Sequence, residues 1–128
     1  MNITHIRNAT QLISYAGKRL LIDPMLAPKG AYPGFPGTAY AERRNPTVEL
    51  PVDVNTLLDA DAVIVTHTHD DHWDEAAIAA IPKTLPVFVQ HEADGALLRL
   101  VTEANRIKLA HYFDPYLAIH TSLVDPLP

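Results

Sequence analysis

The sequence contains a short run of side chains that can bind metal, His67-Thr68-His69-Asp70-Asp71-His72. In an extended segment, residues i and i+2 point to the same side, so His67 and His69 can offer their imidazoles to one ion. Asp71 and His72 follow where the chain turns, and they can face a second ion. Two ions about 3.5–4 Å apart bind a bridging water, lower its pKa towards neutrality and polarise a carbonyl or phosphoryl oxygen. The spacing therefore predicts hydrolysis at a dinuclear metal site, without a protein nucleophile.

Two structural interpretations compete with metal binding. The run could be a solvated, histidine-rich loop, or Asp71 could cap the following helix by accepting backbone N–H groups. A cap needs one acidic residue and gives no reason for three histidines within six positions. Metal binding is therefore the favoured interpretation, and the candidate ligands are His67, His69, Asp71 and His72.

The composition limits the kinds of ligand and partner. The chain has 128 residues, seven histidines and no cysteine, so histidine and carboxylate side chains are the available metal ligands. Its formal net charge is −5 and it has no basic stripe, so nucleic acid is not expected as a partner. The N-terminus has no basic stretch before an apolar core, and no window approaches about eighteen apolar residues. We therefore expect a cytoplasmic protein with a small-molecule substrate and no membrane partner.

The elements around the run follow an α/β order. The apolar stretch 62–66 predicts a strand buried on both faces, and the histidines begin where it ends. Acidic residues open the next segment and helix formers continue it, which predicts a helix that stops before Pro82. In such a layered domain, chemistry is expected at the carboxyl ends of the strands. The expected strands are 3–7, 10–16, 19–23, 62–66, 86–90 and, less regular, 107–112, and the expected helices are 54–58, 74–81 and 92–105.

A long segment between Pro24 and Pro51 contains six prolines and three glycines, and it shows neither strand nor helix periodicity. Loops of this length in a compact domain are uncommon and often act as lids or binding loops. A plain surface excursion is an equally good interpretation. Trp73, directly after the histidine run, is interpreted as an anchor between helix and sheet, with a pocket wall as the alternative.

The motif His67-x-His69-x-Asp71-His72 after an apolar strand resembles the signature of the metallo-β-lactamase superfamily. The earlier run Leu20-Leu21-Ile22-Asp23-Pro24 is similar to that superfamily's N-terminal meander, and the chain looks most like the L-ascorbate-6-phosphate lactonase-like metal-dependent hydrolases. The resemblance covers residues 1 to about 100. It implies that His67 and His69 ligate a first zinc ion, and that Asp71 and His72 ligate a second. It also implies Asp71 as the catalytic residue that handles a proton, Asp23 as a supporting residue, and manganese or iron as substitutes for zinc.

The resemblance also implies an incomplete fold. The superfamily's members consist of two similar αβ halves packed sheet to sheet, and this chain has about half the expected length. We therefore expect the N-terminal half of an αββα sandwich, an α/β fold with a mixed β-sheet and helices on one face. It would be a single truncated domain over residues 1–128, with an atypical tail over 101–128 produced by truncation or a frame change. The later histidines, His91, His111 and His120, lack the family's glycine-flanked setting, and no Gly-Asp segment supplies a bridging acid.

Two functions remain open on the sequence. The first is a zinc-dependent hydrolase that attacks a lactone, ester, amide or phosphoester through a metal-bound hydroxide. The second is a catalytically incomplete half-domain that binds metal weakly and acts by self-association or partner binding, with a homo-oligomer covering the open face of its sheet. The number of metal ligands separates the two, because a catalytic zinc normally takes three protein ligands and a water.

Overall fold

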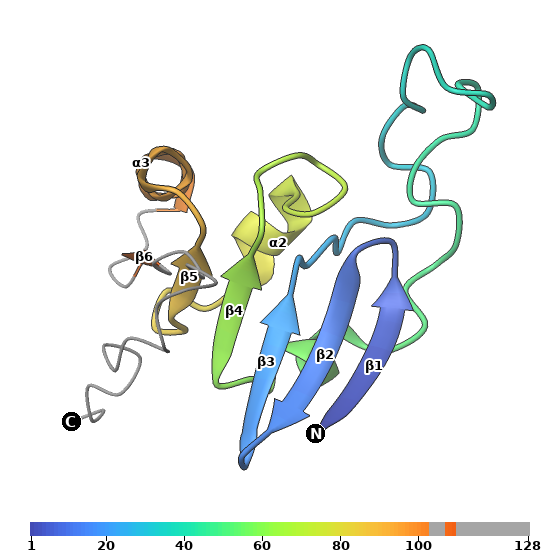
Figure 1. Cartoon of the computed structure of the whole chain (residues 1–128). Coiled ribbons are helices and arrows are strands. Elements are labelled where there is room, and N and C mark those ends of the chain that lie inside the picture. The colour runs from blue at the N-terminus through green and yellow to red at the C-terminus, as the bar shows by residue number, and fades with distance from the viewer. Residues whose placement is uncertain (103–106, 110–128) are drawn as a thin grey trace, which may run out of the picture.

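The computed structural model describes residues 1–102 and 107–109, which form one mixed β-sheet and three helices (Figure 1). The strands lie in the order β1-β2-β3-β4-β5-β6, so each strand pairs with its neighbour in sequence. β1, β2 and β3 pair antiparallel, whereas β3 to β6 pair parallel. The strands are β1 Asn2–Arg7, β2 Thr10–Tyr15, β3 Lys18–Ile22, β4 Ala62–Val65, β5 Val87–Val89 and β6 Ile107–Leu109, and the helices are α1 Val54–Leu58, α2 Glu75–Ala80 and α3 Glu92–Thr102.

The connections follow from the direction of each strand. A two-residue turn joins β2 to β3, and its residues Ala16 and Gly17 have φ angles of +50° and +77°, as a tight hairpin of matching twist requires. Parallel strands need longer crossovers, and each crossover from β3 to β6 contains one helix. The turn that carries the histidines is part of the crossover from β4 to β5.

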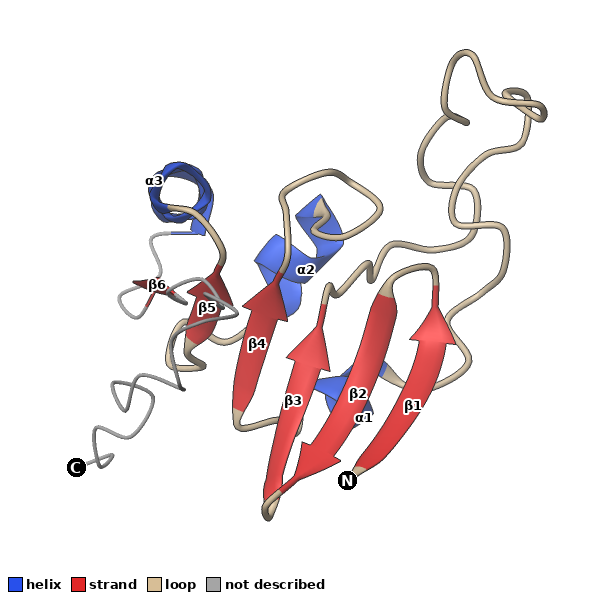
Figure 2. Ribbon diagram, in the orientation of Figure 1, coloured by secondary structure: helices blue, strands red, loops and turns tan. Residues whose placement is uncertain are grey.

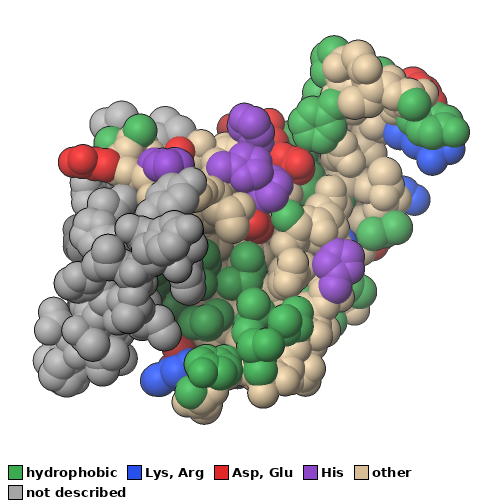
Figure 3. Space-filling model, viewed as in Figure 1, with side chains coloured by type: hydrophobic (Ala, Val, Ile, Leu, Met, Phe, Trp, Pro, Cys, Tyr) green, Lys and Arg blue, Asp and Glu red, His purple; other side chains and the backbone are tan. Residues whose placement is uncertain are grey.

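The two faces of the sheet are covered differently. One face packs against the helices in a single core, to which Leu57 of α1, Ala77 of α2 and Leu98 of α3 contribute. Figure 2 shows α1 and α2 behind the strands. The other face is also apolar, since the paired strands align Ile13 with Leu20, Ile22 with Ile64, and Ile64 with Phe88. Hydrophobic side chains are visible across this face in the space-filling view (Figure 3).

The structure confirms the expected fold class, an α/β arrangement with a mixed sheet and helices on one face. The expected strands and helices are present, and their ends differ by at most one residue where the chain is described. Residues 103–106 and 110–128, which include most of the expected atypical tail, lie outside the described part of the chain. None of the helices in the described part combines the length and apolarity needed to cross a bilayer.

The long segment between β3 and α1 is fastened at its base by Arg7. This side chain is 2% exposed, and its guanidinium donates to the carbonyl oxygens of Met25 at 2.8 Å, of Val48 at 3.1 Å and of Ala27. Burial lowers the pKa of Arg7, while the negative charge of Asp74 opposes that shift. One buried cation therefore fixes both ends of the segment to β1.

Arg7→Met is expected to lower the free energy of unfolding by about 3–5 kcal/mol, because two buried carbonyl oxygens and one partly buried carbonyl oxygen lose their donors and Asp74 loses a nearby positive charge. Urea unfolding followed by circular dichroism measures the loss. Arg19→Met is the matched control, since the Arg19 pair with Asp59 is exposed and should contribute at most about 1 kcal/mol. Equal losses for the two variants would contradict the structural role of Arg7.

Candidate metal centre

The histidine run forms a turn between the end of β4 and the start of α2, at the carboxyl end of the parallel strands (Figure 1). The backbone N–H groups of His72 and Trp73 both donate to the carbonyl oxygen of His69, at 2.8 Å each, and fold the run back on itself. The imidazole rings of the three histidines consequently lie close together. The ring centroids of His67 and His69 are 4.8 Å apart, and those of His67 and His72 are 3.7 Å apart.

Three side chains of this turn present ligand atoms to a common point. One atom each from His67, His69 and Asp71 lies within 4.8 Å of the other two. Oδ1 of Asp71 is buried and has no hydrogen-bond partner among the described residues, although a buried carboxylate oxygen needs one. A divalent cation supplies such a partner, and a set of imidazole nitrogens and a carboxylate suits zinc, manganese or iron. The residues present therefore fit a metal ion.

His72 lies beside this group and is held from the opposite side. Its Nδ1 is 2.9 Å from Oδ2 of Asp23, and its Nε2 is 3.7 Å from Oδ2 of Asp71, which is too long for a hydrogen bond. An ionised carboxylate only accepts hydrogen bonds, so Nδ1 of His72 carries the hydrogen. Nε2 faces Asp71, and in the neutral ring it has the lone pair through which a histidine ligates a metal.

Asp23 connects the end of β3 to the turn. Its φ of +44° lies in the left-handed region, which aspartate tolerates better than most residues, and its exposed fraction is 3%. Oδ1 accepts the backbone N–H of Thr66 at 2.7 Å, and Oδ2 accepts the Thr66 hydroxyl at 2.8 Å as well as the His72 N–H. One buried carboxylate therefore holds the first residue of the turn and one of its last.

The predicted ligands all lie on this turn. Asp71 is grouped with His67 and His69, and its Oδ2 also lies 3.7 Å from Nε2 of His72. The assignment of individual ligands to a first and a second ion stays a prediction. His91 follows β5 and is not a member of this group, and His111 and His120 lie outside the described residues.

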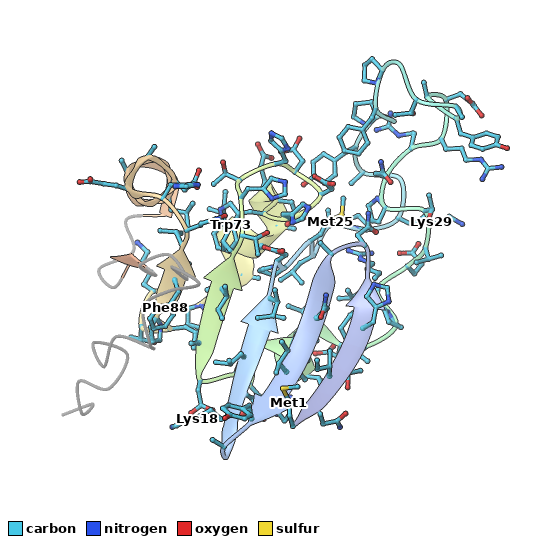
Figure 4. All side chains as sticks on the ribbon, viewed as in Figure 1. Met1, Lys18, Met25, Lys29, Trp73 and Phe88 are labelled. Carbon is cyan, nitrogen blue, oxygen red and sulfur yellow. The ribbon has the colours of Figure 1, made fainter. Side chains whose placement is uncertain are left out.

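Trp73 and Asp74 join the turn to α2. Trp73 is 4% exposed and belongs to the core, as its interpretation as an anchor requires, and Figure 4 shows it at the same end of the sheet as Met25. Asp74 caps α2, because its Oδ1 accepts the N–H of Ala77 at 2.7 Å. Neither the capping role of Asp74 nor the part of Thr66 in the turn was predicted from the sequence. An acidic residue before helix formers signals such a cap, whereas nothing local signals the hydrogen bonds from Thr66 to Asp23.

Comparison with known proteins identifies sequence relatives of the chain. Residues 2–118 match the family described as "Beta-lactamase superfamily domain". Over 96 residues the chain is 55% identical to the UPF0173 protein YddR of Bacillus subtilis, and this alignment covers 74% of the chain and 38% of that protein. The family match over residues 2–118 includes the strands and the turn that form the candidate site.

Two solved structures share the fold at high identity. The isothiocyanate hydrolase from Delia radicum gut bacteria has a TM-score of 0.81 and 52% identity, over 89% of this chain and 45% of that one. A protein from Veillonella parvula described as "a possible metal-dependent hydrolase" has a TM-score of 0.80 and 48% identity, over 84% and 41%. The chain thus spans less than half the length of each of these relatives. From its family match, its sheet and its histidine turn, the chain belongs to the β-lactamase superfamily and has a metallo-β-lactamase-like fold.

Proposed function

We propose that this chain provides the metal-binding part of a metal-dependent hydrolase. The proposal rests on the turn after β4, where His67, His69 and Asp71 present ligand atoms within 4.8 Å of one another and a buried oxygen of Asp71 has no partner among the described residues. Two similar solved structures are described as an isothiocyanate hydrolase and as "a possible metal-dependent hydrolase", and this supports the same chemistry here. Zinc is the proposed ion, with manganese or iron as alternatives, because the ligand atoms are nitrogen and oxygen.

The proposed ligands are the three members of that group together with His72. A divalent ion bound there acts as a Lewis acid and activates water for hydrolysis near neutral pH. Asp23 holds His72 in the tautomer that leaves Nε2 free. The two oxygens of Asp71 differ, since Oδ1 lacks a hydrogen-bond partner within the described part of the chain and Oδ2 faces Nε2 of His72 at 3.7 Å. Asp71 can therefore bind an ion through one oxygen and accept a proton at the other, which is its proposed catalytic role.

The proposed substrate is a small molecule with an electrophilic centre that water can attack. Lactones, esters, amides and phosphoesters meet this requirement, because each has a carbonyl or phosphoryl oxygen that can be polarised. Isothiocyanates join the panel because one solved relative is an isothiocyanate hydrolase, and the central carbon of an isothiocyanate is an electrophile of the same kind. A test panel therefore contains one member of each class.

The open face of the sheet favours a second candidate function. Among the described residues, no further layer covers the apolar face that contains Leu20, Ile64 and Phe88. The chain also spans only 38–45% of the relatives compared above. Under this alternative it is a catalytically incomplete half-domain that binds metal weakly and associates with itself or with a partner through the open face. Metal affinity and turnover separate the two candidates.

His69→Ala is expected to lower metal affinity at least about tenfold, because it removes one of three converging ligand atoms and even the loss of an outer partner costs 10–100-fold. Elemental analysis of protein purified without chelator, followed by titration against a chelating dye, measures the loss. His5→Ala is the matched control, since His5 lies on β1 and contacts the carbonyl oxygen of Asn8. Equal metal content in the two variants would refute the proposed ligand set.

Asp23→Asn is expected to weaken metal binding by about 10–100-fold. The amide has a single acceptor oxygen, so its NH2 group would face one of the donors from Thr66 or His72, and His72 would lose its fixed orientation. Asp61→Asn is the control, because Asp61 bonds to Lys18 and Arg19 at the far end of β3. Unchanged affinity in Asp23→Asn would show that the carboxylate does not organise the ligands.

Turnover of the substrate panel decides between the two candidate functions. The metal-loaded chain is expected to hydrolyse at least one substrate, and the rate should fall at least about 100-fold after chelation and in Asp71→Ala. Product release followed by liquid chromatography measures the rate, and light scattering gives the mass of the particle. Metal binding without turnover, in a particle larger than one chain, would instead support the half-domain.

A further inference from the structure

The hydroxyl of Thr66 lies where three side chains of the candidate site meet. Its Oγ1 is 2.8 Å from Oδ2 of Asp23, 3.3 Å from Nδ1 of His72 and 3.4 Å from Nδ1 of His67. Thr66 directly precedes the histidine run, and its backbone N–H donates to Oδ1 of Asp23 at 2.7 Å. The backbone and the side chain of Thr66 are thus held by the same carboxylate.

The hydrogens of this group can be assigned by counting donors and acceptors. A threonine hydroxyl has one hydrogen and two lone pairs, whereas an ionised carboxylate only accepts. Oδ2 of Asp23 therefore takes the hydroxyl hydrogen of Thr66 and the Nδ1 hydrogen of His72. Thr66 has no second hydrogen to donate, so it can only accept one from Nδ1 of His67. The neutral ring of His67 then has its lone pair on Nε2.

His67 depends on the Thr66 hydroxyl more than His72 does. Nδ1 of His72 is 2.9 Å from Asp23, which binds it more closely than the hydroxyl at 3.3 Å. For Nδ1 of His67, no hydrogen-bond partner other than Thr66 is found within the described residues. A distance of 3.4 Å is long for an N–H···O hydrogen bond, so this contact selects a tautomer rather than holding the ring rigidly.

We propose that Thr66 is a positioning residue that fixes the tautomer of His67. Its hydroxyl extends the effect of the buried carboxylate of Asp23 from His72 to a second ring, and it leaves Nε2 of His67 with the lone pair that a metal ion needs. The two rings, whose centroids are 3.7 Å apart, both direct Nδ1 towards Thr66. This inference rests on the proposed function, since His67 is a proposed metal ligand.

Two variants separate the hydroxyl from the rest of the Thr66 side chain. Thr66→Val keeps nearly the same shape without the hydroxyl, whereas Thr66→Ser keeps the hydroxyl and loses the methyl group. Thr66 is exposed, and Asp23 keeps its donors from the backbone of residue 66 and from His72, so both variants should fold. Thr38→Val is the matched control, because its hydroxyl bonds to the carbonyl oxygen of Phe35 instead.

Long-range proton–nitrogen NMR spectra of the metal-free chain, recorded at mildly alkaline pH, measure the tautomer of each ring. In the unaltered chain we expect His67 and His72 to have their hydrogens on Nδ1. In Thr66→Val, the ratio of the two tautomers of His67 should shift about two- to tenfold towards the Nε2–H form, as the loss of one hydrogen bond allows. Thr66→Ser and Thr38→Val should keep the original spectrum, and His72 should not change in any variant, because Asp23 remains.

Titration with cobalt(II) measures the consequence for metal binding, because its visible absorption band reports the arrangement of the ligands as well as the affinity. In Thr66→Val the dissociation constant should rise about tenfold, the lower end of the change seen when an outer partner of a metal site is removed. The absorption band should shift as well. Thr66→Ser and Thr38→Val should bind cobalt as the unaltered chain does.

An Nε2–H form of His67 in the unaltered chain, or an unchanged tautomer in Thr66→Val, would overturn the inference and leave the proposed function standing. A changed tautomer with unchanged cobalt affinity would overturn it too, because the hydroxyl would then not position a ligand. An equal loss of affinity in Thr66→Ser would assign the effect to the methyl group, with the same result. Absence of cobalt binding in the unaltered chain would remove the proposed function. In that case a shifted tautomer in Thr66→Val would still support the hold of Thr66 on His67, and an unshifted one would overturn it.

Discussion

The carboxylate of Asp23 is the group on which the candidate site depends. It is buried, and it accepts hydrogen bonds from the backbone and hydroxyl of Thr66 and from the ring of His72. A buried carboxylate is tolerated only while donors satisfy it, so these donors keep their places as long as β3 and β4 are paired. The pairing of Ile22 with Ile64 sets the spacing between Asp23 and the turn. The positions of the candidate ligands therefore depend on the sheet, although these residues lie on a turn.

A second buried carboxylate, that of Asp74, plays a similar structural role at the other end of the turn. It bonds to the long segment and to α2, and Arg7 fastens that segment to β1. Ordering one backbone residue costs about 1–2 kcal/mol in conformational entropy, so a free turn of this length would bind an ion only against a large cost. Here the loss of conformational entropy has already occurred when the sheet and the core fold, before any ion binds. The site is preorganised in this sense.

Much of the fold could be predicted from local sequence patterns. The apolar run that forms β4 and the acidic start of α2 are visible in a single window, and the spacing of His67, His69 and Asp71 indicated a metal site because few structural roles need that pattern. The distances between these side chains depend on how the turn folds back, which residue types do not determine. Contacts between segments that are distant in the chain could not be predicted from local patterns either. Ala27 and Asp74, for example, are 47 positions apart.

The strand order of the sheet follows the chain from β1 to β6 without a swap. During synthesis, each strand can consequently be added to a partner that has already left the ribosome, and loop closure between strands stays short apart from the long segment. Asp23 is in place before the histidines are made, and the turn needs only α2 behind it to close. The candidate metal centre is therefore assembled from about the first eighty residues. In evolutionary terms, such a segment can be copied, fused or recombined as one unit without separating these candidate ligands from one another.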